Sequence, residues 1–210
     1  MVENQHVQAG ERLIAPSMKG IWLVRHGETE WSKSGAHTGT SDIELTDRGR
    51  QQAIGLGEAL SGYSFELILV SPLIRAFETC RLAGFSRSAF TDSNLKEWDY
   101  GDFEGKTTMD IRREIPGWCI WDEGARNGES IYDVANRAEA VIQRATTVEG
   151  NVLLFSHGHL LRILAARWLE LPPRDGRLFA LATASISLLS YERDTRVIER
   201  WNNPSQNQRQ

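Results

Sequence analysis

Long apolar runs, a framework of cysteines and an excess of positive charge are all missing from this sequence of 210 residues. No segment approaches the roughly 18 to 20 consecutive apolar residues of a membrane-spanning helix, so we expect no membrane partner. Lys and Arg number 24 against 28 Asp and Glu, and we find no local basic patch of the kind that nucleic-acid binding requires. We therefore expect no nucleic-acid partner.

The two cysteines, Cys80 and Cys119, are too few for a disulfide framework and lack the spacing of metal ligands. Two free thiols in a reducing compartment are the simplest interpretation, which indicates the cytoplasm. The seven tryptophans belong mostly to the core or a pocket wall in this interpretation. They could also include an exposed interface patch, so a homo-oligomer stays open.

The length suits one globular domain, because a domain typically holds about 100 to 200 residues. Residues 1–19 contain no apolar run like the core of a signal peptide, and we interpret them as a flexible tail. Residues 202–210 are polar and contain one proline, which predicts a second flexible tail. The domain is therefore expected to span residues 20–201.

Short apolar runs alternate with segments of helical periodicity along this domain. Strands are expected at 20–24, 66–71, 152–155, 184–191 and 196–201, with a turn at 193–194 between the last two. Helices are expected after the caps Thr46 and Ser130, from Pro72 to Ala83, and from Leu160 to Leu171. Between Ala83 and Ser130 the pattern predicts irregular structure. The alternation indicates a layered α/β domain.

Four loops at or near expected strand ends carry side chains that suit a phosphoryl group. They present Arg25 with His26, Arg75, Glu97 and His157, and functional groups gather at the carboxyl ends of strands in open α/β sheets. A phosphoryl group carries about two negative charges, which two guanidiniums and two imidazoles complement. This predicts a pocket for a small phosphorylated substrate.

His26 follows the first expected strand directly, between Arg25 and Gly27. Neighbouring cations hold an imidazole neutral near pH 7, so its lone pair stays available for in-line attack on phosphorus. The small Gly27 is expected to let the substrate approach. We predict that His26 is the nucleophile and becomes phosphohistidine.

Transfer from an alkoxide also needs an acid for the leaving oxygen, and the same carboxylate can later activate water. Glu97 lies in an acidic and aromatic segment, 95–105, that shows no helical or strand periodicity. Asp99, Asp102 and Glu104 compete with Glu97 on spacing alone. The residues themselves leave the acid open among these four carboxylates.

Metal binding is the other interpretation of the pair His157 and His159, which flank Gly158. Two histidines around a glycine, with no carboxylate and histidine set nearby, make a poor ligand group. We therefore expect no metal and no cofactor. His159 begins the next helix, and capping, substrate contact and a structural role all remain open for it.

Five motifs resemble, in order, those of the histidine phosphatase superfamily, the phosphoglycerate mutase-like enzymes. They are Leu23–Thr29 (LVRHGET), Leu45–Gly49 (LTDRG), Ser71–Ala76 (SPLIRA), the Glu97 segment and Ser156–His159 (SHGH). The resemblance covers roughly residues 21–201 and implies a three-layer α/β/α sandwich with a mostly parallel sheet. It also implies His26 as nucleophile, Glu97 as acid and base, and phosphate ligands at Arg25, Arg75 and His157.

Within the superfamily, the segments 30–39, 97–102 and 127–129 look like the branch that contains the fungal sedoheptulose-1,7-bisphosphatases. The same matching implies that Thr38 and Gly39 line the substrate side and that Tyr100 faces the sugar. Ser32 stands where many relatives carry a phosphate-binding Asn, and a hydroxyl can donate there too.

The resemblance favours a metal-independent phosphatase for a sugar bisphosphate such as sedoheptulose 1,7-bisphosphate. Lys33, His37 and Arg126 are the candidates for contact with a second phosphate. The link 172–184 looks shorter than in the fungal enzymes, which leaves the length of the substrate open. Arg112 and Arg113 are interpreted as a solvated helix face rather than the basic cluster of a mutase. A phosphoglycerate mutase and a catalytically silent phosphate-binding module are the alternatives.

Overall fold

The computed structural model describes residues 19–204, so most of the tails expected at 1–19 and 202–210 lies outside the described residues. A six-stranded sheet with the order β3-β2-β4-β1-β5-β6 runs through the centre. The strands are β1 (Ile21–Arg25), β2 (Leu67–Val70), β3 (Ala89–Thr91), β4 (Val152–Ser156), β5 (Ser185–Glu192) and β6 (Thr195–Pro204). The first four strands pair in parallel, whereas β5 and β6 run antiparallel to their neighbours. The expected mostly parallel sheet is confirmed.

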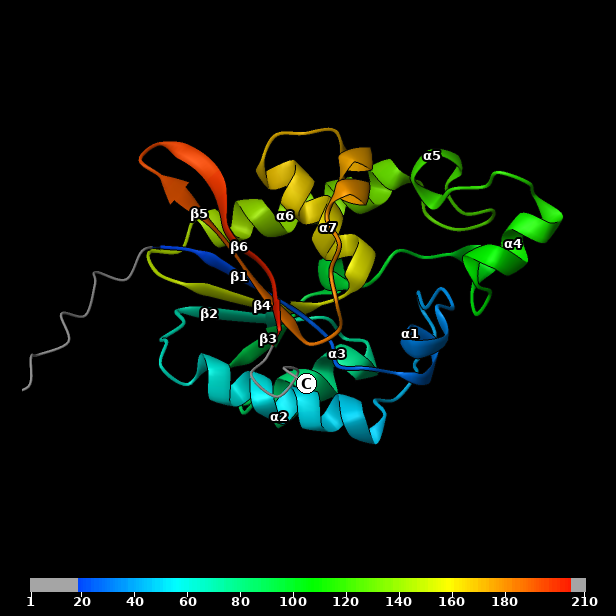
Figure 1. Ribbon diagram of the computed structural model, residues 1–210. Helices are drawn as coiled ribbons and strands as arrows, with labels where there is room; N and C mark the ends of the chain where they lie inside the picture. The colour runs from blue at the N-terminus through cyan, green and yellow to red at the C-terminus, as the bar shows by residue number, and fades with distance from the viewer. Residues whose placement is uncertain (1–18, 205–210) are drawn as a thin grey trace, which may run out of the picture.

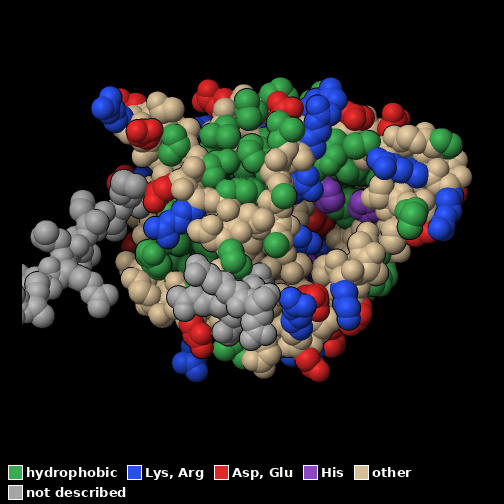
Figure 2. Space-filling view, in the orientation of Figure 1, with side chains coloured by type: hydrophobic (Ala, Val, Ile, Leu, Met, Phe, Trp, Pro, Cys, Tyr) green, Lys and Arg blue, Asp and Glu red, His purple; other side chains and the backbone are tan. Residues whose placement is uncertain are grey.

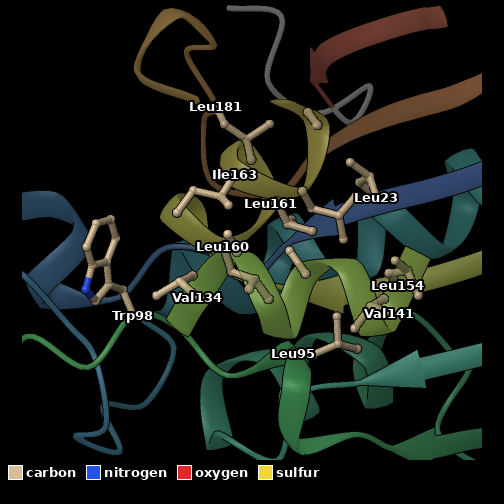
Figure 3. Packing of buried hydrophobic residues seen from close by; sticks show 14 of the residues in the cluster. Leu23, Leu95, Trp98, Val134, Val141, Leu154, Leu160, Leu161, Ile163 and Leu181 are labelled. Atoms are coloured by element: carbon tan, nitrogen blue, oxygen red, sulfur yellow. The ribbon is translucent and has the colours of Figure 1, made fainter. Parts of the chain in front are cut away.

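Helices cover both faces of this sheet (Figure 1). The helices α2 (Asp47–Leu60) and α3 (Ile74–Leu82) lie on one face, and α6 (Ile131–Thr146) and α7 (Gly158–Trp168) lie on the other. Each face has its own apolar cluster. Figure 3 shows the larger one, in which Leu23 of β1 and Leu154 of β4 pack against side chains of α6 and α7. The three-layer α/β/α sandwich is therefore confirmed.

The central strands are apolar at nearly every position because both of their faces are covered. In β1 the side chains of Trp22 and Val24 enter one apolar cluster, and those of Ile21 and Leu23 enter the other. All five residues of β4 are buried. Alternate side chains of one strand thus contribute to both cores.

The two helix caps expected from the sequence are present. The Thr46 side chain accepts a hydrogen bond from the main-chain N–H of Gly49. The Ser130 side chain accepts from the N–H of Asp133, whose side chain accepts from the N–H of Ser130, so the two form a capping box. These bonds satisfy N–H groups that a helix leaves unpaired at its first turn.

Several boundaries differ from the expected ones. The helix expected from Pro72 begins at Ile74, because the main chain stays extended at the cap, Leu73. The last strand continues to Pro204 rather than ending at residue 201. Asn202, expected in the tail, donates its N–H to Ser187 Oγ at 3.0 Å and accepts from the N–H of Ala182 at 2.7 Å. Those bonds hold residues 202–204 in the sheet.

The expected irregular middle contains short elements that the periodicity did not indicate. They are β3, η1 (Ser93–Leu95), η2 (Gly101–Phe103), α4 (Thr108–Glu114) and α5 (Ile120–Glu123). Two further short elements are α1 (Glu30–Ser34) and η3 (Pro173–Leu178). Figure 1 places α1, α4 and α5 beyond the carboxyl end of β1. A bridge between Ala36, which follows α1, and Thr107, which precedes α4, joins these two helices.

No helix within residues 19–204 is long and apolar enough to cross a membrane. Five of the seven tryptophans are buried, and Trp31 and Trp201 are partly exposed. The tryptophans thus contribute to the core and to the walls described below rather than to an exposed patch.

Candidate active site

The register of two parallel strands brings the predicted histidines together. Arg25, the last residue of β1, pairs with Ser156, the last residue of β4. The residues that follow, His26 and His157, therefore leave the sheet side by side, with ring centroids 5.2 Å apart. The neighbour of β4 in the sheet, β2, ends at Val70. The Oγ of the following residue, Ser71, lies 2.7 Å from His157 Nε2.

The His26 ring is oriented by its own loop. Its Nδ1 lies 2.7 Å from the carbonyl oxygen of Gly27. A carbonyl only accepts, so Nδ1 carries the proton and Nε2 keeps a lone pair in the neutral ring. Burial, followed by the charges of Arg75 and Arg25, lowers the pKa of His26 well below its ordinary value of 6.5, and the bond to Gly27 opposes this shift. Such a ring is neutral at physiological pH and has a free lone pair on Nε2.

Gly27 is required for packing. It is not among the residues that line the cavity, and the access expected for it stays a prediction. A Cβ at this position would collide with the main chain of Gly49 in α2. Its N–H donates to Thr79 Oγ1 on α3 at 3.0 Å. Gly27 therefore lets the His26 loop lie directly on the helices of one layer.

Two buried arginines flank the histidines. Arg25 donates through Nη1 to the carbonyl of Leu181 at 2.5 Å. Arg75 is completely buried, and its Nη1 and Nη2 donate to main-chain carbonyls. These carbonyls belong to Ser41, Thr38 and Gly39, each at 2.9 Å. Both side chains are thus oriented by main-chain oxygens, which leaves their Nε–H groups for another partner.

Unpaired buried donors mark the centre of the site. Within residues 19–204, four buried side-chain atoms have no hydrogen-bond partner, and three of them are Arg25 Nε, Arg75 Nε and His157 Nδ1. Buried polar groups are normally paired, so a cluster of unpaired ones points to a ligand. Nitrogen donors beside two guanidiniums suit an oxyanion. We call Arg25, His26, Arg75 and His157 the cradle.

The tautomer of His157 follows from Ser71. Ser71 Oγ accepts the N–H of Leu73 at 3.3 Å. Within residues 19–204, His157 Nε2 is the only acceptor that the Ser71 hydroxyl reaches, so we assign the hydroxyl hydrogen to that bond. The proton of the ring then lies on Nδ1, the unpaired atom. Burial, then Arg75 and the other cradle charges, lower the pKa of His157 well below 6.5. His157 is therefore a neutral donor toward the same space.

Glu97 is held at the amino end of α7. Its Oε1 accepts from the N–H of Leu160 at 2.9 Å and from that of Trp98 at 3.0 Å. Its Oε2 accepts from the N–H of His159 at 3.0 Å. A carboxylate at this place satisfies N–H groups of the first turn, which fits a start of α7 at Gly158, two residues before the expected Leu160.

The other carboxylates of this segment are engaged elsewhere. Asp99 accepts from Gly101 N–H, and Glu104 accepts from the N–H groups of Gly39 and Ser41. Asp102 accepts from the side chain of Asn127, and none of the three lines the cavity, whereas Glu97 does. Glu97 is thus the one member of the four that lines the cavity.

The cavity has a volume of about 380 Å³, within the usual range for a small-molecule site. His26 and Arg25 line it together with residues of the α1 loop, the Glu97 segment, α4, α5 and α7. Figure 2 shows histidine side chains in a hollow of the surface, with Lys or Arg side chains close by. Arg75 and His157 are not among the lining residues, and the His157 ring lies next to that of His26.

Another part of the cavity lining consists of aromatic and uncharged polar rings. We call these rings the wall: His37, Tyr100, Trp118, Trp121 and His159. The Tyr100 hydroxyl lies 2.6 Å from His159 Nδ1. Burial raises the pKa of Tyr100 well above 10 and lowers that of His159 well below 6.5.

Tyr100 therefore donates to His159 Nδ1, and Nε2 of His159 carries the proton. His37 Nε2 lies 3.2 Å from Thr108 Oγ1, and burial lowers the pKa of His37 to about 4. The wall is uncharged at neutral pH, with hydrogen-bonding groups between aromatic faces.

The residues expected on the substrate side are only partly in the cavity. Ser32, Thr38 and Tyr100 line it, whereas Gly39 does not. Gly39 packs against Trp98 and Glu104, and its carbonyl holds Arg75. The Ser32 hydroxyl donates to the carbonyl of Thr29 at 2.9 Å within the cap of α1, so its hydrogen is used locally.

The candidates for a second phosphate also need correction. Of Lys33, His37 and Arg126, only His37 lines the cavity, and it is held neutral. Two arginines that were not proposed for this role, Arg112 and Arg162, line it instead.

Arg112 turns inward because its Nε donates to the carbonyl of Trp118 at 2.8 Å. Arg113 pairs with Asp110, as a solvated helix face would. The Arg162 guanidinium lies over the Trp121 ring, 4.6 Å from its centroid. Its spacing of three residues from His159 on α7 was the available signal, since such residues share a helix face.

Among the described residues, no group of three or more His, Cys, Asp or Glu side chains is arranged to hold a metal ion. His157 and His159 face different partners, Ser71 and Tyr100.

Comparison with known proteins gives consistent matches. A family model described as histidine phosphatase superfamily (branch 1) matches residues 21–204. The chain is similar to an acid phosphatase of Mycobacterium tuberculosis, with 41% identity over 85% of this chain and 89% of the other. It is also similar to sedoheptulose 1,7-bisphosphatase of Saccharomyces cerevisiae, with 35% identity over 71% and 67%. The solved structure of an open reading frame from Mycobacterium tuberculosis has a TM-score of 0.85 and 38% identity, and covers 89% of this chain and 98% of that chain.

Proposed function

We propose that this chain, which belongs to branch 1 of the histidine phosphatase superfamily, hydrolyses a sugar bisphosphate such as sedoheptulose 1,7-bisphosphate. It is a phosphatase that acts on phosphate monoesters, as its family and its relatives do. The substrate and the roles of single residues are the proposal, and the cradle is the starting point for those roles.

In the first step, the phosphoryl oxygens accept hydrogen bonds from the three unpaired donors, Arg25 Nε, Arg75 Nε and His157 Nδ1. His26 Nε2 attacks phosphorus, and the bond from phosphorus to the ester oxygen breaks. Glu97 in its acid form gives its proton to that oxygen, so the leaving group departs as an alcohol. The enzyme is left with phosphohistidine and a carboxylate.

In the second step, the Glu97 carboxylate takes a proton from water as the water oxygen attacks phosphorus. The bond from phosphorus to nitrogen breaks, and its electron pair returns to His26. Inorganic phosphate leaves, and Glu97 is again in the acid form. Neither step calls for a metal ion, because the cradle supplies the positive charge.

One observation carries the choice of a bisphosphate: Arg112 and Arg162 line the cavity outside the cradle. Within residues 19–204 the only hydrogen bond of Arg112 is the one from its Nε, so both of its terminal nitrogens are free to bind an anion. The similar yeast protein is a sedoheptulose 1,7-bisphosphatase, which supports a sugar with a phosphate at each end. The aromatic rings that line the same cavity suit the carbon chain.

A phosphate-release screen tests this proposal across sugar bisphosphates, sugar monophosphates, phosphoglycerates and nucleotides. We expect the highest kcat/KM for a sugar bisphosphate. Arg112→Met should raise KM for that substrate about tenfold, the value of one charge-assisted hydrogen bond, and leave the matched monophosphate nearly unchanged. Arg113→Met is the control on the same helix. Equal kcat/KM for bisphosphate and monophosphate would contradict the choice of substrate.

A phosphoglycerate mutase is the second candidate, because Arg112 lies in the cavity and could hold a substrate carboxylate. The chain is also 30% identical to a probable phosphoglycerate mutase of Salmonella choleraesuis. Incubation with 3-phosphoglycerate and bisphosphoglycerate separates the two. Formation of the isomer faster than release of phosphate would replace the phosphatase assignment of this site by the mutase.

A further inference from the structure

The main chain around Glu97 is held by an ion pair that lies outside the cavity. Arg137 on α6 binds Glu129, which precedes that helix, through two parallel bonds. Nε to Oε1 measures 2.8 Å and Nη2 to Oε2 measures 2.7 Å. The two side chains are only 18% and 24% exposed, and neither residue lines the cavity. This geometry is the bidentate arrangement that orients a guanidinium most firmly.

The same guanidinium binds three main-chain carbonyls at and before Glu97. Nη1 donates to the carbonyl of Asn94 at 2.9 Å and to that of Lys96 at 2.8 Å. Nη2 donates to the carbonyl of Glu97 itself at 3.3 Å. One side chain thus fixes the main chain up to and including the catalytic candidate.

Glu129 holds the segment on the other side of Glu97. Its Oε2 accepts from the N–H of Asp99 at 3.0 Å, and its own N–H donates to the carbonyl of Asp99 at 3.0 Å. Its carbonyl accepts from Trp98 Nε1 at 2.8 Å. The segment between η1 and η2 has no helix or strand of its own, so these bonds replace regular structure.

Proton transfer depends on where that main chain lies. The acid must come within hydrogen-bond reach of the leaving oxygen, and a displacement of about 1 Å can cost roughly a hundredfold in rate. We propose that Arg137, oriented by Glu129, is a positioning residue that holds Glu97 within hydrogen-bond reach of the leaving oxygen. The inference rests on the proposed function, in which Glu97 is the acid.

The test compares leaving groups in Arg137→Lys, which keeps the charge and loses the planar fork. We expect kcat/KM for an alkyl phosphate such as glycerol 2-phosphate to fall roughly ten- to a hundredfold. We expect kcat/KM for p-nitrophenyl phosphate to fall less than about threefold, because p-nitrophenolate leaves without a proton. The ratio kcat/KM reports the first step alone, before water attacks phosphohistidine.

Two further variants and one stability measurement complete the comparison of leaving groups. Arg167→Lys is the matched control, since Arg167 joins α7 to Glu139 of α6 at 2.6 Å and makes no bond to the Glu97 segment. It should leave both substrates unchanged. Glu129→Gln removes the partner charge and should reproduce the selective loss, including where Arg137→Lys does not fold. Thermal melting identifies the folded variants.

The outcomes separate this inference from the proposal on which it rests. Equal losses on both substrates, or none, in folded Arg137→Lys and Glu129→Gln would overturn the positioning role. Glu97→Gln is measured in the same series and should show the selective loss at about a hundredfold or more. If Glu97→Gln lacks that selectivity, the acid role itself fails; if Glu97→Gln has it and the Arg137 variant does not, only the positioning role fails.

Discussion

The cradle and the wall line one site but come from different parts of the chain. Arg25, His26 and His157 stand at the ends of β1 and β4, which pair in register. The wall comes from the α1 loop, from the excursion between residues 99 and 129, and from α7. The position of the cradle therefore depends on the sheet, whereas that of the wall depends on how loops pack against one another.

The two regions also differ in how their polar groups are satisfied. Three donors of the cradle have no partner among residues 19–204, whereas the polar rings of the wall bind each other or their neighbours, as Tyr100 binds His159. The unpaired donors of the cradle suit an anion, whereas the wall offers aromatic faces and neutral hydrogen-bonding groups. Changes in the cradle should affect all substrates alike, and changes in the wall should affect some more than others.

The largest effect is expected from the cradle. His26→Ala removes the nucleophile, so turnover of every phosphate monoester should fall at least about 10⁴-fold, and covalent labelling by substrate phosphate should disappear. Rapid-quench labelling and steady-state phosphate release measure the two effects. Near-normal turnover by this variant would remove His26 from the mechanism and with it the distinction between the regions.

The free energy of unfolding at acid pH should depend on His37, a residue of the wall. Its pKa is lowered from 6.5 to about 4 in the folded protein, so between these values the unfolded chain binds a proton that the folded protein does not. Stability therefore falls as pH decreases through this window, by roughly 3 kcal/mol from this residue.

Urea unfolding at pH 7 and pH 4 measures the loss, and His37→Gln should show a smaller one. His26, His157 and His159 contribute in the same direction, so some loss should remain in the variant. Identical pH dependence in the two proteins would contradict the burial of a neutral His37.

A smaller effect is expected from Ser71, which binds His157 of the cradle. Ser71→Ala removes the donor to His157 Nε2, so Nδ1 is no longer held as the protonated atom, and kcat/KM should fall about tenfold for all substrates. Ser190→Ala, which removes another buried hydroxyl, is the control and should have no effect on activity. A loss confined to sugar phosphates would place Ser71 with the wall in function.

The smallest effect should be the most selective. Tyr100→Phe keeps the ring and removes the donor to His159 Nδ1, so the His159 ring can also adopt its other tautomer. We expect kcat/KM to fall roughly three- to tenfold for hydroxylated substrates and to stay unchanged for p-nitrophenyl phosphate. Comparison of a sugar phosphate with p-nitrophenyl phosphate measures the split. An equal loss on both would show that Tyr100 acts on the phosphoryl group, and Tyr100 would then belong with the cradle in function.

The cradle could be predicted because its signals are local. Arg25 and His26 end an apolar run, and the caps Thr46 and Ser130 mark helices that are present in the structure. The sequence alone left Glu97 among four carboxylates, and only the resemblance singled it out. The structure separates it physically, since the N–H groups that bind it belong to Trp98 and to a helix more than 60 residues away.

The wall could not be predicted because its contacts are not local. The helices α4 and α5 have seven and four residues, too few for a periodic pattern to stand out. The direction of Arg112 depends on one carbonyl, that of Trp118. Gly27 is required by Gly49, which is distant in sequence and close in space. Such contacts become visible only when the layers are assembled.

The excursion that supplies part of the wall begins and ends at one place. The main chain of Asp99 is joined to Glu129 by a pair of hydrogen bonds, each 3.0 Å long, so the two ends of a segment of about thirty residues meet. The interior of the segment is anchored as well, since Phe103, Ile111 and Trp118 are buried in the larger apolar cluster. For protein engineering, an exchange of this segment with that of a related enzyme therefore has to keep both the junction of Asp99 with Glu129 and these buried side chains.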